Sequence, residues 1–178
     1  YNIFSKNHFY IVPGGSTPRL FYNMLAERVQ DWNDTKFILS DERITYKKQL
    51  SNTAMINKIF IQKIKGNNVP ELLLYNLKGP QSIIEKKLKF LTPKLAVLGL
   101  GVDGHTASLF PGDPKIFNNN AVLIKTNNDW EEFDRISLTF NYLMKTDKIV
   151  FLVNGKEKAQ ALKECLEGNF NPVEYPAQ

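Results

Sequence analysis

Short apolar runs alternate along the chain with segments of helical character, and this alternation constrains the fold more than any other feature. The runs are rich in Val, Ile, Leu and Phe, as buried strands are, and they span residues 8–12, 36–40, 94–100, 121–126 and 148–153. Helices are expected between them, over residues 17–30, 51–64, 80–91 and 156–167. Near-continuous apolar strands that alternate with helices predict an α/β fold with a mostly parallel sheet.

The segment 17–30 illustrates why helices are expected. Ser16 or Thr17 is placed to cap its amino terminus, and Pro18 suits the first helical position. Its apolar residues recur at the spacing of one helical face, which is expected to pack on the sheet. These residues are Leu20, Phe21, Met24, Leu25 and Val29.

Composition narrows the class of protein. The chain has 178 residues, of which 43% are hydrophobic, and this suits one globular domain over residues 1–178. A net charge of +5 favours an anionic partner. Because the basic residues are scattered and form neither an arm nor a patch interleaved with aromatic residues, a small acidic ligand is expected and nucleic acid is not.

Cysteine usage and hydropathy indicate the compartment. Cys165 is the only cysteine, so a disulfide within the chain and a cysteine metal cluster are excluded, and a reducing environment is expected. No apolar run approaches the ~18 residues of a membrane span, and the first residues lack the order of a signal peptide. The protein is therefore expected to be soluble and cytoplasmic, without membrane contact.

Polar sequence follows four of the predicted strands, and ligands collect at the carboxyl ends of strands in parallel α/β sheets. PGGSTP, DER, GVDGHTASLFPG and NGKEK follow the runs that begin at residues 8, 36, 94 and 148. In the first loop, Gly14 and Gly15 allow close approach of a ligand, and Ser16 and Thr17 suit a phosphate. Taken alone, this loop is better explained as a strand-to-helix turn, and it is not a P-loop, because no Gly-Lys-Ser/Thr follows.

Four charged residues are candidates for ligand binding, and two of them directly follow a predicted strand. Asp41 and Arg43 belong to DER, where an arginine can face an anionic ligand or a developing negative charge. Arg135, in RISLT, and Lys158, in NGKEK, are ordinary residues when considered singly. Lys158 lies in the first turn of a predicted helix, where a cation is unfavourable to the helix dipole unless an anion binds nearby.

The stretch GLGVDGHTASLFPG, residues 99–112, has three glycines at the spacing of a dinucleotide-binding fingerprint: Gly99, Gly101 and Gly104. That fingerprint requires a long helix after the glycines, to hold the pyrophosphate at its amino terminus. Pro111 ends the following run after barely two turns. A cofactor site is therefore weakly supported.

His105 is the more informative residue of this stretch. It follows a glycine turn at a strand end, and Asp103, two positions away, can orient its imidazole for general-base catalysis. A lone histidine is more often structural, as is expected for His8 at the start of a strand. No metal site is expected, since no second histidine lies near His105 and the carboxylates lack a ligand spacing.

The sequence resembles the 6-phosphogluconolactonase family over residues 9–177. The resemblance rests on GLGVDGHTASLFPG, GGSTP, DER, the Ser51-Asn52 pair, RISLT and FLVNGKEKA, which occur in that family's order and at similar spacing. It implies a three-layer α/β sandwich of modified Rossmann type, with helices on both faces of the sheet. It also implies hydrolysis of 6-phosphoglucono-1,5-lactone to 6-phosphogluconate in the oxidative pentose phosphate pathway, without a metal or cofactor.

The same resemblance implies roles for individual residues. His105 would activate water, Asp103 would orient His105, and Arg43 would stabilise the oxyanion or hold the substrate. The remaining substrate-binding residues would be those of the phosphate cradle together with one acid, namely Gly14, Gly15, Ser16, Thr17, Arg135, Lys158 and Asp41.

Three other functions stay open. Glucosamine-6-phosphate deaminase shares the fold, the glycine loop and Asp-Gly-His, but its loop resembles DGHIAFNEP, whose Glu works with the histidine. Phe110 occupies that place here and cannot relay a proton. A non-catalytic sugar-phosphate-binding protein would keep the phosphate cradle without needing His105 and Asp103, and a dinucleotide-dependent oxidoreductase is weaker still.

Two features depart from the family's pattern. Pro13 stands where the family usually has Ser before the two glycines, which removes a hydroxyl and a backbone donor from the edge of the site. The chain is also expected to be short at both termini, since the family has a helix before residues 8–12 and a strand after YPAQ. Either a monomer or a homodimer is consistent with the sequence.

Overall fold

The predicted alternation of strands and helices is confirmed by the computed structural model, which describes residues 4, 6–29, 31–65, 68–125 and 133–178. Within these residues a five-stranded parallel sheet forms the centre of the molecule, in the order β4-β2-β1-β5-β8. Its strands are β1 (Phe9–Val12), β2 (Lys36–Leu39), β4 (Glu71–Leu73), β5 (Leu95–Gly99) and β8 (Ile149–Leu152). All except β4 lie within predicted apolar runs.

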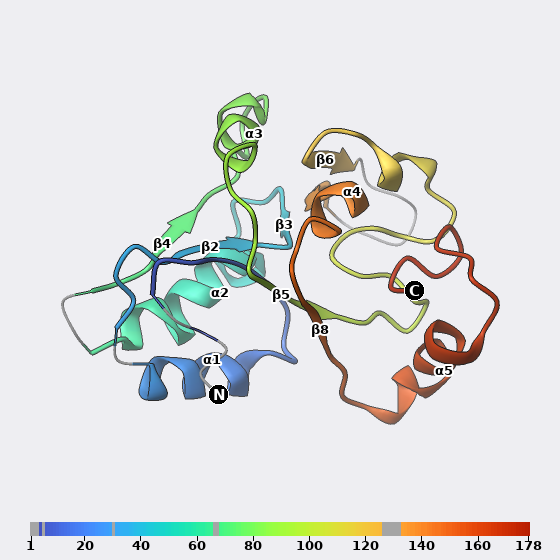
Figure 1. Ribbon diagram of the computed structural model, residues 1–178, viewed down its shortest axis with the longest axis horizontal. Coiled ribbons are helices and arrows are strands. Elements are labelled where there is room, and N and C mark those ends of the chain that lie inside the picture. Colours follow the sequence, from blue (N-terminus) through green and yellow to red (C-terminus); the bar gives the residue numbers. More distant parts are fainter. Residues whose placement is uncertain (1–3, 5, 30, 66–67, 126–132) are drawn as a thin grey trace.

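The strand order reverses beside β1. From β1 the chain moves outward through β2 to β4, and it then returns to form β5 and β8 on the other side of β1. Because parallel crossovers are right-handed, a reversal of direction puts helices on opposite faces of the sheet. Accordingly, α1 (Arg19–Arg28) and α2 (Asn52–Ile59) cover one face, and α3 (Ser82–Leu88) and α4 (Phe140–Leu143) lie on the other (Figure 1).

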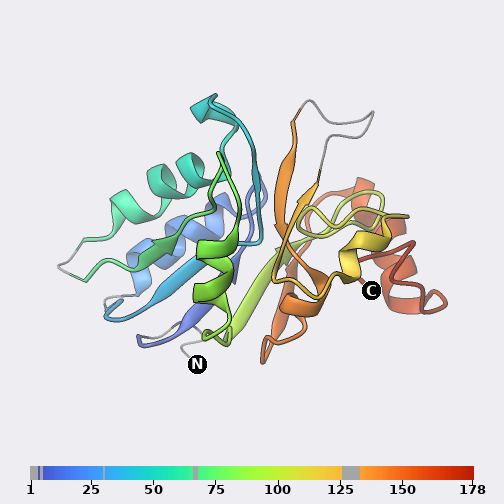
Figure 2. The ribbon, with the colours of Figure 1, turned by 90° about the horizontal axis from the view of Figure 1, so that it is seen from above.

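A second, antiparallel sheet lies beside the central one (Figure 2). It has the order β3-β7-β6 and consists of β3 (Asp41–Arg43), β7 (Arg135–Leu138) and β6 (Val122–Lys125). The apolar run 121–126 therefore forms its strand in this sheet and not in the parallel one; its last residue lies outside the described residues. The sequence pattern does not predict β3, because DER has no strand character, and it does not predict β7.

The four predicted helices are present, each shorter than its segment. The first three are α1, α2 and α3, and the fourth is α5 (Ala159–Glu167), which follows a 3-10 turn, η4 (Lys156–Lys158). Residue 30, the end of the first predicted helix, is outside the described part of the chain. Among the residues that are described, no helix has the length and apolar character needed to cross a bilayer.

The start of α1 differs from the prediction. The helix begins at Arg19 after an N-cap at Pro18, which makes no side-chain capping hydrogen bond, so neither Ser16 nor Thr17 is the cap. The N–H of Arg19 donates to the carbonyl oxygen of Ser16 at 3.3 Å, and this turn delays the helix. The hydroxyl groups of Ser16 and Thr17 are thereby left available to a ligand.

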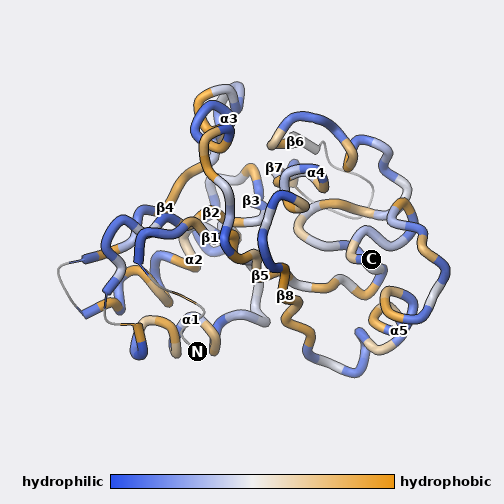
Figure 3. Tube along the Cα trace, in the orientation of Figure 1, coloured by the Kyte–Doolittle hydropathy of each residue, from blue (hydrophilic) through white to orange (hydrophobic). Residues whose placement is uncertain are grey.

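Aromatic side chains fill the core between the central sheet and the helices α1 and α2. The ring of Phe37 on β2 packs against those of Tyr10, Trp32 and Phe60, with centroid distances of 5.4, 5.4 and 5.5 Å. These four side chains are at most 1% exposed. Hydrophobic residues are concentrated along the central strands (Figure 3), as the apolar runs predict.

Only some of the residues on the predicted apolar face of α1 are buried. Substitutions at two leucines of this helix test which of them contributes to the core. Leu25 packs in the core, whereas Leu20, on the predicted stripe, is 70% exposed. We expect Leu25→Ala to lower the free energy of unfolding by about 2–5 kcal/mol through the cavity it leaves. The matched change Leu20→Ala should alter it by less than about 0.5 kcal/mol. Urea unfolding of both variants measures the difference, and equal losses would contradict this packing.

Candidate active site

A cavity of about 320 Å³ opens at the carboxyl ends of β1, β2, β5 and β8, beside the strand reversal. Its lining includes residues 13–17 after β1, residues from 40–43 after β2, residues from 99–107 after β5, and Lys158 after β8. Asn52 of α2 and Arg135 of β7 also line it. The structure thus brings together the four strand ends at which the sequence predicts ligand chemistry, and all the predicted site residues line the cavity except Asp103.

The glycine loop after β1 lies directly against α2. A Cβ atom on Gly14 would overlap with the side-chain amide of Asn52, so only glycine permits this approach. The N–H of Gly15 donates to Asn52 Oδ1 at 3.3 Å. Ser16 and Thr17 are exposed at the cavity. The loop is therefore fixed at its glycines and open to a ligand at its hydroxyl groups.

Glu42 fixes the amino terminus of α2. Its carboxylate, in a residue only 1% exposed, accepts hydrogen bonds from the N–H groups of Asn52 and Thr53 at 2.8 and 2.6 Å. It also accepts one from the hydroxyl of Ser51 at 3.1 Å. These bonds satisfy free donors of the first helical turn and put a negative charge at the positive end of the helix dipole. Glu42 is thus a buried cap for the helix that presents Asn52.

Arg43 extends from β3 to the cavity. Its Nη1 donates to the carbonyl oxygen of Leu50 at 2.9 Å and to Asn52 Oδ1 at 3.3 Å. Both acceptors are neutral, so these bonds orient the guanidinium without cancelling its charge. An oriented cation of this kind suits a bound anion or an oxygen on which negative charge develops.

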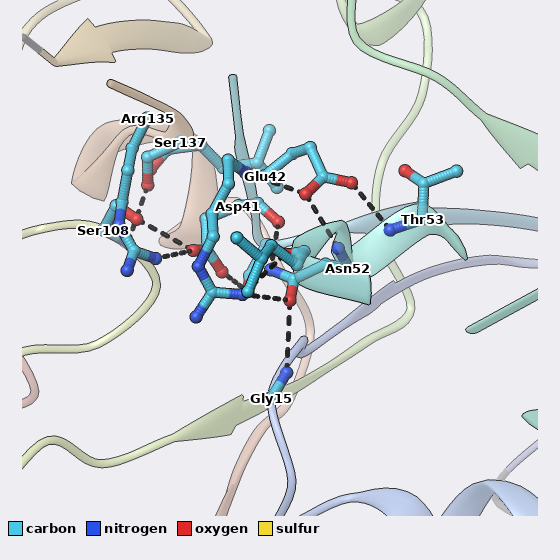
Figure 4. A network of polar contacts seen from close by, with 12 residues as sticks. Gly15, Asp41, Glu42, Asn52, Thr53, Ser108, Arg135 and Ser137 are labelled. Atoms are coloured by element: carbon cyan, nitrogen blue, oxygen red, sulfur yellow. Dashed lines mark hydrogen bonds and ion pairs between the residues drawn. The ribbon is translucent and has the colours of Figure 1, made fainter. Parts of the chain in front are cut away.

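Asp41 holds Arg135 at the cavity (Figure 4), and Arg135 on β7 is the cross-strand partner of Arg43 on β3. Asp41 Oδ2 accepts from Arg135 Nη1 at 3.2 Å and from the hydroxyl of Ser108 at 2.8 Å. Asp41 Oδ1 accepts from the hydroxyl of Ser40 at 3.0 Å. The side chains of Arg135 and Asp41 are only 11% and 9% exposed, so the ion pair is well shielded from water. Because both oxygens of Asp41 are engaged, its contribution is to orient Arg135.

His105 and Asp103 form a hydrogen-bonded pair at the edge of the cavity. His105 Nδ1 lies 2.6 Å from Asp103 Oδ1, which also accepts from the N–H of His105 at 3.2 Å. Partial burial raises the pKa of Asp103, but the hydrogen bonds and charge of His105 outweigh it and lower that pKa to about 2. The carboxylate is therefore ionised at neutral pH and accepts the Nδ1 proton, which leaves Nε2 as the proton acceptor.

The loop after β5 is wound tightly around this pair. The N–H of Gly101 donates to the carbonyl oxygen of His105 at 2.7 Å, and a Cβ atom on Gly101 would overlap with the imidazole and with the Asp103 carboxylate. Residues 100–110, all described, contain no helix. The helix that a dinucleotide fingerprint requires is thus missing after these glycines, which serve instead to fold the chain around His105.

Phe110 packs against the imidazole of His105 and lies near the guanidinium of Arg135. Its ring centroid lies 4.7 Å from that of His105, and the Arg135 guanidinium carbon lies 6.0 Å from it. The position at which a second proton-transferring group would contact His105 is thus apolar.

Sequence reasoning missed three side chains that hold the site together: Glu42, Asn52 and Ser108. Asn52 belongs to a motif that was recognised, but the motif predicts no role for it. Glu42 and Ser108 lie in the motifs DER and GLGVDGHTASLFPG, but neither motif predicts their role, because their side-chain partners lie 9–11 and 67 positions away in the chain.

Similarity to known proteins extends over nearly the whole chain. The family model described as glucosamine-6-phosphate isomerases/6-phosphogluconolactonase matches residues 5–178. A 6-phosphogluconolactonase of Thermotoga maritima is 33% identical over 173 residues, which cover 94% of this chain and 78% of the relative. The crystal structure of 6-phosphogluconolactonase from Thermotoga maritima matches with a TM-score of 0.80 at 31% identity, covering 94% of this chain and 79% of that one.

One structural neighbour has another activity. A monomeric glucosamine-6-phosphate deaminase matches with a TM-score of 0.81 and 20% identity, over 96% of this chain and 79% of its own. At that identity the likeness is one of fold, which both activities share, and the site residues must distinguish them.

The fit of the loop around His105 predicts different effects for two glycine substitutions. Gly101→Ala should displace the imidazole, because the new methyl group overlaps with it, whereas a Cβ on Gly99 meets nothing within 4 Å. We expect the downfield Nδ1–H proton resonance of His105 to shift or disappear in Gly101→Ala and to persist in Gly99→Ala. An unchanged resonance in Gly101→Ala would contradict the close packing of this loop.

Proposed function

Because the chain belongs to the family of glucosamine-6-phosphate isomerases and 6-phosphogluconolactonases, we propose that it hydrolyses 6-phosphoglucono-1,5-lactone to 6-phosphogluconate. This reaction is a step of the oxidative pentose phosphate pathway. The observation that carries the proposal is the His105–Asp103 pair, set beside a cavity that Arg43, Arg135 and Lys158 also line. A base and three cations suit hydrolysis of an anionic ester.

The residues that line the cavity are assigned to two parts of the substrate, the phosphate and the lactone carbonyl. We assign the 6-phosphate to Gly14, Gly15, Ser16, Thr17, Arg135 and Lys158, all of which line the cavity. Asp41 serves this end by orienting Arg135. Lys158 belongs to the 3-10 turn that precedes α5, where a phosphate would offset its unfavourable position. Arg43, whose guanidinium is oriented by the carbonyl oxygen of Leu50 and by Asn52, is left for the lactone carbonyl.

The reaction uses water as the nucleophile. His105 Nε2 takes a proton from water as its oxygen adds to the lactone carbonyl carbon, and the resulting oxyanion is stabilised by Arg43. Collapse of this intermediate breaks the bond between the carbonyl carbon and the ring oxygen, which receives the proton from the imidazolium. The acid formed loses a proton to give the carboxylate. Asp103 holds the imidazole in the required tautomer throughout.

Phe110 favours lactone hydrolysis over the deaminase reaction. Ring opening and isomerisation of an amino sugar need proton transfers beyond those of a single base. The group that contacts His105 at position 110 is a phenyl ring, which neither donates nor accepts a proton. We therefore expect no turnover of glucosamine 6-phosphate.

We further propose that the chain acts as one sugar-phosphate-binding domain, as a monomer or homodimer, in a reducing and cytoplasmic setting suited to its single, free Cys165. The substrate is a small sugar phosphate and not a nucleic acid. No metal or cofactor has a step in this reaction, because His105 supplies the base and Arg43 supplies the positive charge.

The two histidines of the chain provide a matched test of the base. His105→Ala should lower the catalysed rate by about 10²-fold or more while 6-phosphogluconate still binds, because general-base catalysis is lost. His8→Ala, immediately before β1 at the other edge of the sheet, should leave the rate within about twofold of the wild type. Hydrolysis of freshly generated lactone at mildly acidic pH, where spontaneous opening is slow, measures both.

If the wild type binds 6-phosphogluconate without accelerating lactone hydrolysis, the enzymatic proposal fails and a binding protein replaces it. Turnover of glucosamine 6-phosphate would instead favour the deaminase.

Two lysines of one turn test the phosphate site. Lys158 lines the cavity, whereas Lys156 of the same turn is exposed and does not. Lys158→Ala should raise KM by about 10-fold or more with a smaller change in kcat, because a charge-assisted contact to the phosphate is lost. Lys156→Ala should leave both constants unchanged. A fall in kcat alone for Lys158→Ala would move this residue from the phosphate to the reacting carbonyl.

A further inference from the structure

We propose that Asn52 is a positioning residue that couples Arg43 to the glycine loop, so that the two ends of the substrate site are held as one unit. The inference rests on the hydrolase function proposed above, which places Arg43 at the lactone carbonyl and the loop at the phosphate. It gives a role to a side chain that need not touch the reacting atoms.

The contacts of one amide group carry the proposal. Asn52 Oδ1 accepts from Arg43 Nη1 and from the N–H of Gly15, each at 3.3 Å, while Nδ2 donates to the carbonyl oxygen of Asp41 at 3.1 Å. Figure 4 shows Asn52 between the Gly15 loop and the strand that bears Asp41. A single side chain thus joins β3, its arginine and the loop after β1.

The amide is held in one orientation. Asn52 is 4% exposed, and its backbone N–H donates to the buried carboxylate of Glu42 at 2.8 Å. Its oxygen faces two donors and its nitrogen faces an acceptor, so an aspartate would set an oxygen against the Asp41 carbonyl and a leucine would satisfy none of the three groups. When every donor and acceptor of a buried polar group is hydrogen-bonded, any movement of the group leaves one of them unsatisfied. Such a group therefore holds its partners at fixed positions relative to one another.

The backbone at Gly14 makes the coupling steric as well as polar. Because a Cβ atom at this position would overlap with the Asn52 amide, the loop rests on the same group that orients Arg43. Displacement of Asn52 would therefore move the phosphate loop and the cation together. Positioning errors of about 1 Å can cost about 10²-fold in rate, so a shared support for both ends has catalytic value.

The first test needs no substrate. In the unliganded protein, Arg43→Ala should shift the backbone amide resonance of Gly15 when Asn52 is present, and should leave it unmoved in an Asn52→Ala background. An unshifted Gly15 amide, or an equal shift in both backgrounds, would overturn the proposal. Because this readout is independent of turnover, it still decides the coupling if the lactonase activity itself is not found.

The second test measures coupling in catalysis by a double-mutant cycle on kcat/KM. Asn52→Ala alone should lower kcat/KM by about 10-fold or more, and its effect in an Arg43→Ala background should be smaller by at least about 5-fold. A merely structural role would give the same loss in both backgrounds, and this result would overturn the proposal. Asn141→Ala, which removes an amide bonded to the carbonyl oxygens of Phe117 and Asn118, is the matched control and should be additive with Arg43→Ala.

Gly14→Ala supplies a second perturbation if Asn52→Ala does not fold. Its methyl group should push the Asn52 amide away from Arg43 and lower kcat/KM, with little further loss when Arg43 is already alanine. Where Asn52→Ala does fold, it should also relieve the overlap, so Gly14→Ala should cost less in that background. Equal losses from Gly14→Ala with and without Arg43 would overturn the coupling.

Discussion

The strand order β4-β2-β1-β5-β8 forces the connections after β1 and β5 to leave the edge of the sheet in opposite directions. The first turns toward α1 and α2, and the second turns away toward the antiparallel sheet. Between these two connections lies the cavity that Gly14, Gly15 and His105 line. The location of the site is thus a property of the topology, and the loop sequences determine only which chemistry occupies it.

The second sheet begins with β3, which one residue separates from the end of β2. Because side chains alternate along a strand, the three charged side chains of β3 point to different partners. Asp41 is directed to Arg135, Glu42 to the amino terminus of α2, and Arg43 to Asn52 and the cavity. Two buried carboxylates in sequence are costly to desolvate unless each is paired. Here a guanidinium and two hydroxyls satisfy one of them, and backbone N–H groups with a hydroxyl satisfy the other. DER is therefore a structural junction between the two sheets, and its Asp41 and Arg43 also line the cavity.

The features that the sequence predicts correctly are those with a local physical cause. Apolar runs identify β1, β2 and β5, which are largely buried, and the edge strand β8, and the polar sequences that follow these strands line one cavity. The errors arise where distant partners decide. β3 is a strand because it pairs with β7, residues 135–138, and Leu20 is exposed because α1 turns Tyr22 and Leu25 to the core. The role of Asn52 depends on Gly15, 37 positions away, and no pattern within α2 indicates it.

A shared fold leaves the reaction to be decided by single positions, and position 110 is the sharpest of these. A carboxylate there would lie beside His105, where it could exchange protons, and beside Arg135, where it would compete with Asp41 for the guanidinium. Phenylalanine removes both interactions. Arg135 keeps its ion pair with the buried Asp41 at the cavity, and His105 keeps its hydrogen bond to Asp103. Hydrolysis of a lactone needs one base and one stabilised oxyanion, so the apolar ring restricts the site to the chemistry that this pair can perform.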